Sequence, residues 1–286
     1  MNRRTFVQSS IASALLAARP AWPTDSARKI DTIGLQLYTV RNAMEKDFEG
    51  TIARVAAVGY REVEFAGYFD HSPKDVRIVL DRHGLTSPSA HVDYDVIENK
   101  WPETLEAAHT IGHSYIIRPG IEEPQRNQPD GWKRAAELFN RVGEASRKAG
   151  IQFAYHNYSF EFEPAKSLGG KMPYDFLLAE TDPKLVQMEM DLCWITVAGQ
   201  DPLTYFERYP GRFPLVHVKD WKGGKGHAGE QSSRMADVGR GDIDWKRIFA
   251  QSGKAGIRHY FVENDEPKSI FDSIRTSFEY LRDLRF

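Results

Sequence analysis

A glycine repeatedly separates a helix-length amphipathic stretch from the short run of β-branched or aromatic residues that follows it. This arrangement occurs at Gly59, Gly84, Gly112, Gly150 and Gly256. Glycine is favoured at the end of a helix because it adopts the left-handed backbone conformation without steric cost. The repeated order of helix, glycine and strand predicts alternating α and β elements, which is the pattern of a parallel sheet.

Eight strand-like runs alternate with these amphipathic stretches, of which residues 47–58, 132–148 and 269–284 are the clearest. The predicted strands are residues 32–38, 62–66, 88–92, 114–118, 152–156, 186–191, 215–219 and 260–263. Eight βα units in about 260 residues match the size of a closed barrel. We therefore predict an α/β fold, a single (β/α)₈ TIM barrel over residues 28–286. The alternative is a doubly wound open sheet, which usually has a glycine-rich turn after its first strand. Residues 39–42 read TVRN and contain no glycine, which disfavours this alternative.

The first 27 residues are predicted to be an export signal and a short linker rather than part of the barrel. Residues 2–7 read NRRTFV and precede a weakly apolar stretch at 11–18. Paired arginines before a mild hydrophobic segment are typical of twin-arginine signals, which carry folded proteins. The alternatives are an ordinary secretory signal and a disordered basic start. The prediction is a periplasmic protein that acquires its metal before export.

Composition excludes several classes of protein. The formal net charge is −2, whereas a general nucleic-acid binder usually has a basic excess. A single cysteine, Cys193, excludes an intrachain disulfide and any multi-cysteine metal site. No apolar run approaches the roughly 20 residues of a membrane span. We expect no nucleic-acid or membrane partner, and a homo-oligomer is left open.

Ionisable residues gather where the predicted strands end. In a barrel these positions face the active-site mouth, so the side chains should converge. The polar residues at or just beyond the strand ends are Gln36, Tyr38, Glu64, His91, Arg118, His156, Asn157, Glu161, Glu189, Asp191, His217, Lys219 and Glu263. Strand interiors are normally apolar, so this pattern indicates a functional site.

Four of these residues predict a metal site in the second half of the barrel: Glu161, Asp191, His217 and Glu263. Three carboxylates converging with one imidazole would repel one another unless a cation lay between them. Taken singly, each could instead be a turn cap or a salt-bridge partner. Oxygen-rich ligands with one histidine suit one divalent ion, with Mn²⁺ expected first and Mg²⁺, Co²⁺ and Zn²⁺ as alternatives.

Several sequence blocks, in order, resemble a known family. Residues 34–41 read GLQLYTVR, 155–162 read YHNYSFEF, 190–194 read MDLCW, 198–202 read AGQDP, 209–220 read YPGRFPLVHVKD and 239–245 read GRGDIDW. These blocks are similar to those of sugar phosphate isomerase/epimerase-like proteins in the xylose isomerase-like TIM barrel superfamily. One departure is Tyr158, which stands where the family's YHNH motif has its second histidine.

The resemblance implies one divalent metal ion on the four residues named above, with Glu163 and Glu189 as nearby competitors of Glu161. It also implies a proton-transfer pair, Glu161 and Glu263, and an oxyanion-stabilising lysine, Lys219. Sugar contacts are expected from Gln36, Glu64, His91 and His156.

Three functions follow as alternatives. The first is a metal-dependent sugar isomerase or epimerase that removes a proton next to a carbonyl and passes through an enediolate. The second is a lyase that uses the same proton abstraction to eliminate the C1 substituent of a 3-keto-glycoside. A periplasmic location favours the lyase, because phosphorylated sugars are mainly cytoplasmic. The third is a non-catalytic periplasmic sugar-binding protein. An abasic-site endonuclease would want more histidine ligands and a basic surface.

Overall fold

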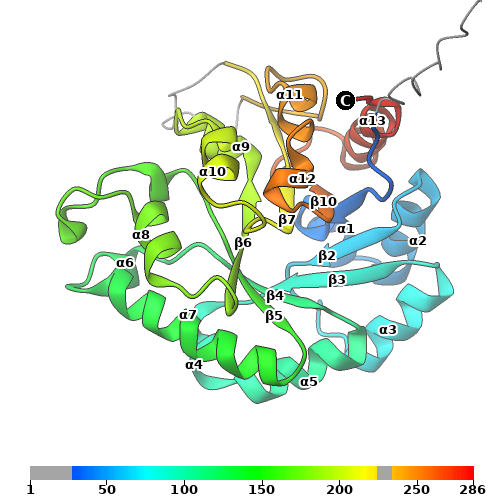
Figure 1. Cartoon of the computed structure of the whole chain (residues 1–286). Helices are drawn as coiled ribbons and strands as arrows, with labels where there is room; N and C mark the ends of the chain where they lie inside the picture. Colours follow the sequence, from blue (N-terminus) through cyan, green and yellow to red (C-terminus); the bar gives the residue numbers. More distant parts are fainter. Residues whose placement is uncertain (1–27, 224–233) are drawn as a thin grey trace, which may run out of the picture.

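Eight parallel strands close into a barrel in this computed structural model, which describes residues 28–223 and 234–286 (Figure 1). The order around the barrel is β1-β10-β7-β6-β5-β4-β3-β2, with every neighbouring pair hydrogen-bonded in parallel. The predicted (β/α)₈ TIM barrel is therefore confirmed, and the open sheet is excluded. The predicted export signal lies outside the described residues.

The strands coincide with the eight predicted runs. They are β1 (Gly34–Gln36), β2 (Glu62–Phe65), β3 (Thr86–His91), β4 (Tyr115–Pro119), β5 (Gln152–His156), β6 (Val186–Asp191), β7 (Leu215–Val218) and β10 (His259–Val262). A separate two-stranded sheet pairs β8 (Asp220–Trp221) with β9 (Met235–Ala236) in antiparallel fashion.

Helices surround the barrel. They are α1 (Arg41–Met44), α2 (Phe48–Val58), α3 (Pro73–Arg82), α4 (Tyr94–Asn99), α5 (Trp101–Ile111), α6 (Glu123–Arg126), α7 (Gly131–Lys148), α8 (Pro173–Glu180), α9 (Leu192–Val197), α10 (Pro202–Arg208), α11 (Trp245–Phe249), α12 (Ser252–Ala255) and α13 (Ile270–Asp283). Short 3₁₀ turns are η1 (Leu37–Val40), η2 (Phe160–Phe162) and η3 (Lys166–Leu168). All five predicted glycines have positive φ. Gly112, for example, ends α5 in the left-handed conformation. Within the described ranges, no helix has the length and apolar character that crossing a bilayer requires.

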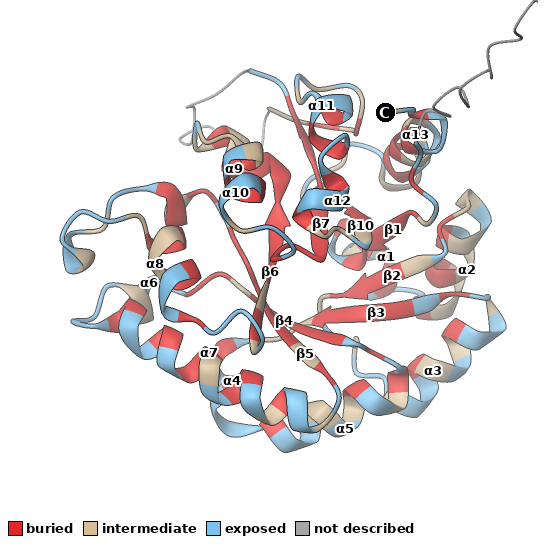
Figure 2. Ribbon diagram, viewed as in Figure 1, coloured by how far each residue is buried: buried red, intermediate tan, exposed pale blue. Residues whose placement is uncertain are grey.

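Each barrel strand has one face toward the helices and one toward the barrel axis, because successive side chains alternate. On β5, Tyr155 packs against Phe139 of α7, with ring centroids 5.4 Å apart. Ala154 and His156, the residues on either side of Tyr155, therefore face the interior. Figure 2 shows that the strands are buried along most of their length.

The interior is layered along the barrel axis. An apolar cluster fills one layer, and its members are Tyr115, Ile117, Ala154, Leu215 and Phe261. Two residues further along β5, β7 and β10, the interior positions hold His156, His217 and Glu263. The apolar cluster thus forms a floor beneath a polar group at the carboxyl ends of the strands, where barrel enzymes place their active sites.

Candidate active site

Four buried side chains from four neighbouring strand ends converge, namely His156 of β5, Asp191 of β6, His217 of β7 and Glu263, which follows β10. We call them the Asp191 group. One potential ligand atom from each lies within 4.8 Å of the others. His217 Nδ1 is 2.8 Å from Glu263 Oε2 and 3.0 Å from His156 Nε2. The group has two nitrogen and two oxygen donors.

Backbone hydrogen bonds fix the position of Asp191. Its Oδ1 accepts hydrogen bonds from the backbone N–H groups of Cys193 and Trp194, so the residue caps the start of α9. The Asn157 side chain accepts a hydrogen bond from the Asp191 backbone N–H. The other carboxylate oxygen, Oδ2, has no hydrogen-bond partner among the described residues, but it lies 3.3 Å from Lys219 Nζ and 3.6 Å from His156 Nε2. The fold thereby holds one oxygen of Asp191, and the other faces the charged and imidazole side chains of the group.

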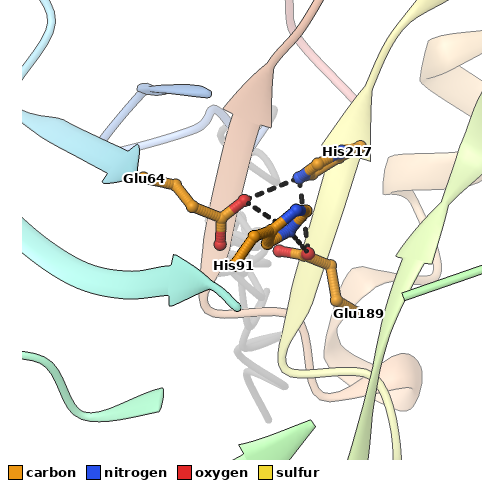
Figure 3. A group of neighbouring side chains, drawn as sticks. All are labelled: Glu64, His91, Glu189 and His217. Atoms are coloured by element: carbon orange, nitrogen blue, oxygen red, sulfur yellow. Dashed lines mark hydrogen bonds and ion pairs between the residues drawn. The ribbon is translucent and has the colours of Figure 1, made fainter. Parts of the chain in front are cut away.

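A second cluster, fully buried except for the partly buried His91, lies on the other side of the His217 ring (Figure 3). We call Glu64, His91, Glu189 and His217 the Glu64 group. Glu64 Oε1 is 2.7 Å from His217 Nε2, and Glu189 Oε2 is 2.7 Å from His91 Nε2. Although burial alone would lower it, the nearby carboxylates, including Glu189 and Glu263, raise the pKa of His217 well above its usual value.

A carboxylate lies beside each ring nitrogen of His217: Glu64 Oε1 is 2.7 Å from Nε2, and Glu263 Oε2 is 2.8 Å from Nδ1. If a cation binds Nδ1, the remaining proton of the neutral ring is on Nε2, and Glu64 accepts its hydrogen bond. Gln36 Nε2 and Ser89 Oγ also donate to the two carboxylate oxygens of Glu64, which fixes its orientation.

The donors of the Asp191 group fit a divalent cation. His156 Nε2 and His217 Nδ1 face each other at hydrogen-bond distance, 3.0 Å, so both can offer a lone pair to a cation when neither carries a proton. Asp191 Oδ2 is buried without a hydrogen-bond partner among the described residues, and Lys219 Nζ lies 3.3 Å from it. Two imidazoles with two carboxylates suit Zn²⁺, Mn²⁺ or Co²⁺ better than Mg²⁺, which prefers oxygen ligands.

Glu161 is not part of this group, which corrects the predicted ligand set. Its buried carboxylate accepts hydrogen bonds from the Tyr155 hydroxyl (2.6 Å) and the Tyr158 backbone N–H (2.9 Å). Because Tyr155 points toward α7, Glu161 lies on the helix side of β5, away from the interior. Burial raises the pKa of Glu161 to about 7, even though the Tyr155 hydrogen bond lowers it. The fourth member of the Asp191 group is His156.

Lys219 connects the Asp191 group to a further carboxylate. Its Nζ is 2.9 Å from Glu263 Oε2, 3.3 Å from Asp191 Oδ2 and 2.9 Å from Asp265 Oδ1. Burial disfavours its charge, but Asp265, Glu263 and Asp191 together raise the pKa of Lys219 well above its usual value. A fixed positive charge therefore lies at the edge of the group. Asp265 was not among the strand-end residues predicted from the sequence, because it lies two residues beyond Glu263.

A cavity of about 650 Å³ opens directly onto the Asp191 group. Glu263, His156, Lys219 and Asp265 line it, and so does His91 of the Glu64 group. The predicted sugar contacts His91 and His156 therefore border the cavity. The other two predicted contacts, Gln36 and Glu64, do not line it: both are fully buried and hydrogen-bonded to each other. Glu64 contacts His217 instead, and Gln36 donates to Glu64.

The two halves of the barrel contribute differently to this cavity. The Asp191 group comes entirely from β5, β6, β7 and the end of β10. Much of the remaining wall comes from the first half of the chain, including Tyr38, Tyr68, Val92 and Val96. The Asp191 group and much of the wall thus come from different halves of the barrel.

A known family model describes this chain. The model for the xylose isomerase-like TIM barrel matches residues 52–284, which is most of the chain. The chain belongs to the xylose isomerase-like TIM barrel family. The predicted resemblance is therefore confirmed at the level of the family.

Curated relatives and solved structures agree with this membership. An inosose dehydratase of Lacticaseibacillus casei is 25% identical over 253 residues, which cover 78% of this chain and 83% of that protein. A sugar phosphate isomerase/epimerase from Parabacteroides distasonis is 27% identical, with a TM-score of 0.73 and 95% and 98% of the two chains covered. The IolI protein, solved with a bound zinc atom, shares the fold at 13% identity and a TM-score of 0.70, over 87% and 95% of the chains.

Proposed function

We propose that this protein is a divalent-cation-dependent lyase that acts on a keto-sugar. It removes the proton next to the carbonyl and eliminates the oxygen substituent on the adjoining carbon. The cation, Mn²⁺ or Zn²⁺ by donor type, is held by His156, Asp191, His217 and Glu263. This is the second of the functions considered from the sequence. Sugar isomerisation or epimerisation, the first of them, is the competing alternative.

The position of Glu161 is the observation that carries this choice. Isomerisation or epimerisation was expected to use Glu161 and Glu263 as two proton carriers on opposite sides of the substrate. Glu161 hydrogen-bonds to Tyr155 on the helix side of β5 and does not line the cavity. Proton-transfer groups at the cavity instead lie together, because Lys219 bridges Glu263 and Asp265. A one-sided arrangement suits an elimination in which one carboxylate serves both proton transfers.

Names of relatives also favour elimination. Curated relatives from Lacticaseibacillus casei and Geobacillus thermodenitrificans are inosose dehydratases, and a dehydratase removes water from its substrate. A structural neighbour from Bacillus anthracis, a probable 3-DHS dehydratase, shares the fold at 10% identity and a TM-score of 0.63. Both names describe loss of water, whereas the Parabacteroides name describes isomerisation or epimerisation.

The chemistry assigned to this chain's residues is as follows. A cation at the Asp191 group would polarise the substrate carbonyl and acidify the adjacent C–H. Asp265 takes that proton, and the C–H electron pair forms a carbon–carbon double bond as the neighbouring C–O bond breaks. The departing oxygen leaves with its electron pair and receives the proton back from Asp265. Lys219 stabilises the negative charge that develops on the carbonyl oxygen.

The test uses methyl 3-keto-glucoside and inosose with the metal-loaded protein in D₂O. We expect the methyl glycoside to release methanol and the inosose to release water, each with formation of a conjugated enone. NMR and ultraviolet absorbance detect these products. Asp265→Asn should lower the rate by about 10²–10⁴-fold, because it removes the proton carrier. Metal content, measured by elemental analysis, should not change in this variant. Asp95→Asn, an exposed acid on α4 that does not line the cavity, is the matched control.

Other outcomes point to the alternative functions. An epimer or isomer that carries deuterium, with no enone, would establish the isomerase or epimerase. Binding of the keto-sugar without any exchange of carbon-bound hydrogen would indicate that the protein is a sugar-binding protein and not an enzyme. Wild-type turnover by Asp265→Asn would remove Asp265 from the mechanism.

A further inference from the structure

The cavity is larger than a single sugar ring. Its volume of about 650 Å³ lies within the range of about 300–1,000 Å³ that pockets for drug-sized ligands span. A six-membered ring seated at the Asp191 group fills only part of that space. The remainder extends toward α4 and α5, whose residues Val96, Thr104 and Ala107 line it.

Apolar and aromatic side chains line much of this remaining space. Tyr38 and Tyr68 lie on its wall, as do Val92, Val96 and Ala107. The charged residues of this region, Asp93, Lys100 and Glu103, are themselves exposed to solvent and lie at the rim. Pockets of this size with apolar walls and a few polar groups typically enclose a ligand with an apolar portion.

Two of the wall residues are unusually exposed for aromatic side chains. Within residues 28–223 and 234–286, the exposed large hydrophobic side chains are Tyr38 (41%), Ile78 (54%) and Tyr158 (37%). Tyr38 and Tyr158 both line the cavity, and Ile78 does not. Tyr38 follows β1 and Tyr158 follows β5, strands that stand opposite each other in the barrel order. Aromatic surface is thus presented from opposite sides of the mouth.

The ring of Tyr158 is held in place by its surroundings. It stacks on Phe160 with centroids 5.9 Å apart and rings inclined by 16°, and it meets the His156 ring edge-on at 5.3 Å. Gly120, with φ of +65°, leaves room for it, since a Cβ at that position would lie 2.8 Å from the Tyr158 ring. Tyr38 is covered on one face by the Arg41 guanidinium, 3.9 Å from the ring centroid. A preordered aromatic wall loses little entropy when a ligand binds.

We propose that the substrate is a keto-glycoside with an apolar, ring-bearing aglycone, which binds in the part of the cavity lined by Tyr38 and Tyr158. This inference rests on the proposed function, and it names the substrate class. In a 3-keto-glycoside the proton leaves C2, its electron pair forms the C1–C2 double bond, and the C1–O bond breaks. The aglycone leaves as an alcohol after protonation of its oxygen, so no oxidant or reductant is consumed.

The experiment compares benzyl 3-keto-glucoside with methyl 3-keto-glucoside. Both release an alcohol of similar acidity, so a difference in kcat/KM reports the contacts of the aglycone rather than its leaving ability. We expect a benzyl-to-methyl ratio of about 10 or more. Tyr38→Ala and Tyr158→Ala should each lower this ratio several-fold, because each removes aromatic surface. Ile78→Ala, an exposed apolar residue of α3 outside the cavity, should keep the wild-type ratio.

A binding measurement separates failure of this inference from failure of the proposed function. Unoxidised benzyl glucoside and methyl glucoside cannot react, and calorimetry gives their relative affinities whether or not the protein is a lyase. Equal binding and equal turnover of the two would overturn the aglycone site and leave the lyase intact. Stronger binding of benzyl glucoside without turnover of any keto-glycoside would support the site and overturn the lyase. A 3-keto-disaccharide preferred over the benzyl compound would also reject the apolar aglycone. Because Tyr38 is exposed, its variant provides the test if Tyr158→Ala fails to fold.

Discussion

A single side chain, His217, joins the two buried groups of the barrel. Its Nε2 lies 2.7 Å from Glu64 and its Nδ1 lies 2.8 Å from Glu263. The ring can serve the Asp191 group through Nδ1 only if Nε2 keeps its proton. Glu64 is therefore a positioning residue that acts through His217, although the sequence suggested that it contacts the substrate.

Replacing Glu64 by Gln should weaken cation binding by about 10–100-fold, the usual cost of losing a carboxylate behind a ligating histidine. The amide can donate as well as accept, so it no longer enforces a single tautomer of His217. Affinity is measured by competition with a chelator, which requires no turnover. Glu62→Gln is the matched control, because Glu62 on the same strand pairs with His259 (3.0 Å), which is in neither buried group. Unchanged affinity in Glu64→Gln would show that the tautomer is fixed by other contacts.

The sequence identified most of the site residues at this scale, and it failed where strand alternation ends. Asp191, His217 and Glu263 converge as expected, because each is at or next to the end of a barrel strand. Glu161 lies in η2, five residues beyond the end of β5, where the two-residue period no longer determines direction. Strict alternation along β5 would have placed His156 in the group instead of Glu161. Tyr155 packs on α7, so its neighbour His156 faces the barrel interior.

At the scale of elements, His113 joins the end of α5 to the first turn after β2. Its Nδ1 lies 2.7 Å from the Ser87 carbonyl oxygen, so Nδ1 carries the proton and donates. Its Nε2, 3.0 Å from the Tyr68 hydroxyl, then accepts a hydrogen bond. The neutral ring satisfies both contacts, whereas a second proton on Nε2 would break the one to Tyr68. Burial lowers the pKa of His113 to about 4.

This depressed pKa predicts an acid-sensitive contribution to stability. In the unfolded chain a histidine has a pKa of about 6.5, so below that pH the unfolded state binds a proton that the folded state excludes. The contribution is present above about pH 6.5 and is lost as the pH falls toward 4. At pH 5 the loss is about 2 kcal/mol. Urea unfolding between pH 7.5 and 5 should show a steeper decline for the wild type than for His113→Gln. The exposed His109 of α5 supplies the control variant His109→Gln, which should decline like the wild type.

The barrel strands and the longer helices were predictable because each is long enough to repeat its pattern of apolar residues, alternation in a strand or helical spacing in a helix. All eight barrel strands and the helices α2, α7 and α13 were located from alternation and helical spacing. Short elements were not, and η1, α4 and α9 are examples. Each spans four to six residues, too few to show a helical period. The antiparallel sheet of β8 and β9 has two residues in each strand, too few to show an alternating pattern in the sequence.

At the scale of the whole molecule, the chain is predicted to be exported as a folded, metal-loaded enzyme. Changing Arg3 and Arg4 to Lys should retain the precursor in the cytoplasm, because twin-arginine export depends on the arginine pair. Cell fractionation with an antibody against the protein measures this directly. Arg19→Lys, outside the pair, is the control. Export of the Lys-Lys form would indicate the general secretory route instead.

The division of the cavity between the two halves of the barrel has an evolutionary consequence. Substitutions at Tyr38, Val92 or Val96 can reshape the chamber without replacing His156, Asp191, His217 or Glu263, because all four residues of the Asp191 group lie on β5, β6 and β7 or follow β10. A lineage can therefore diversify what it accepts while inheriting its reaction unchanged. The same separation makes the first four βα units a natural target for grafting new selectivity onto an old chemistry.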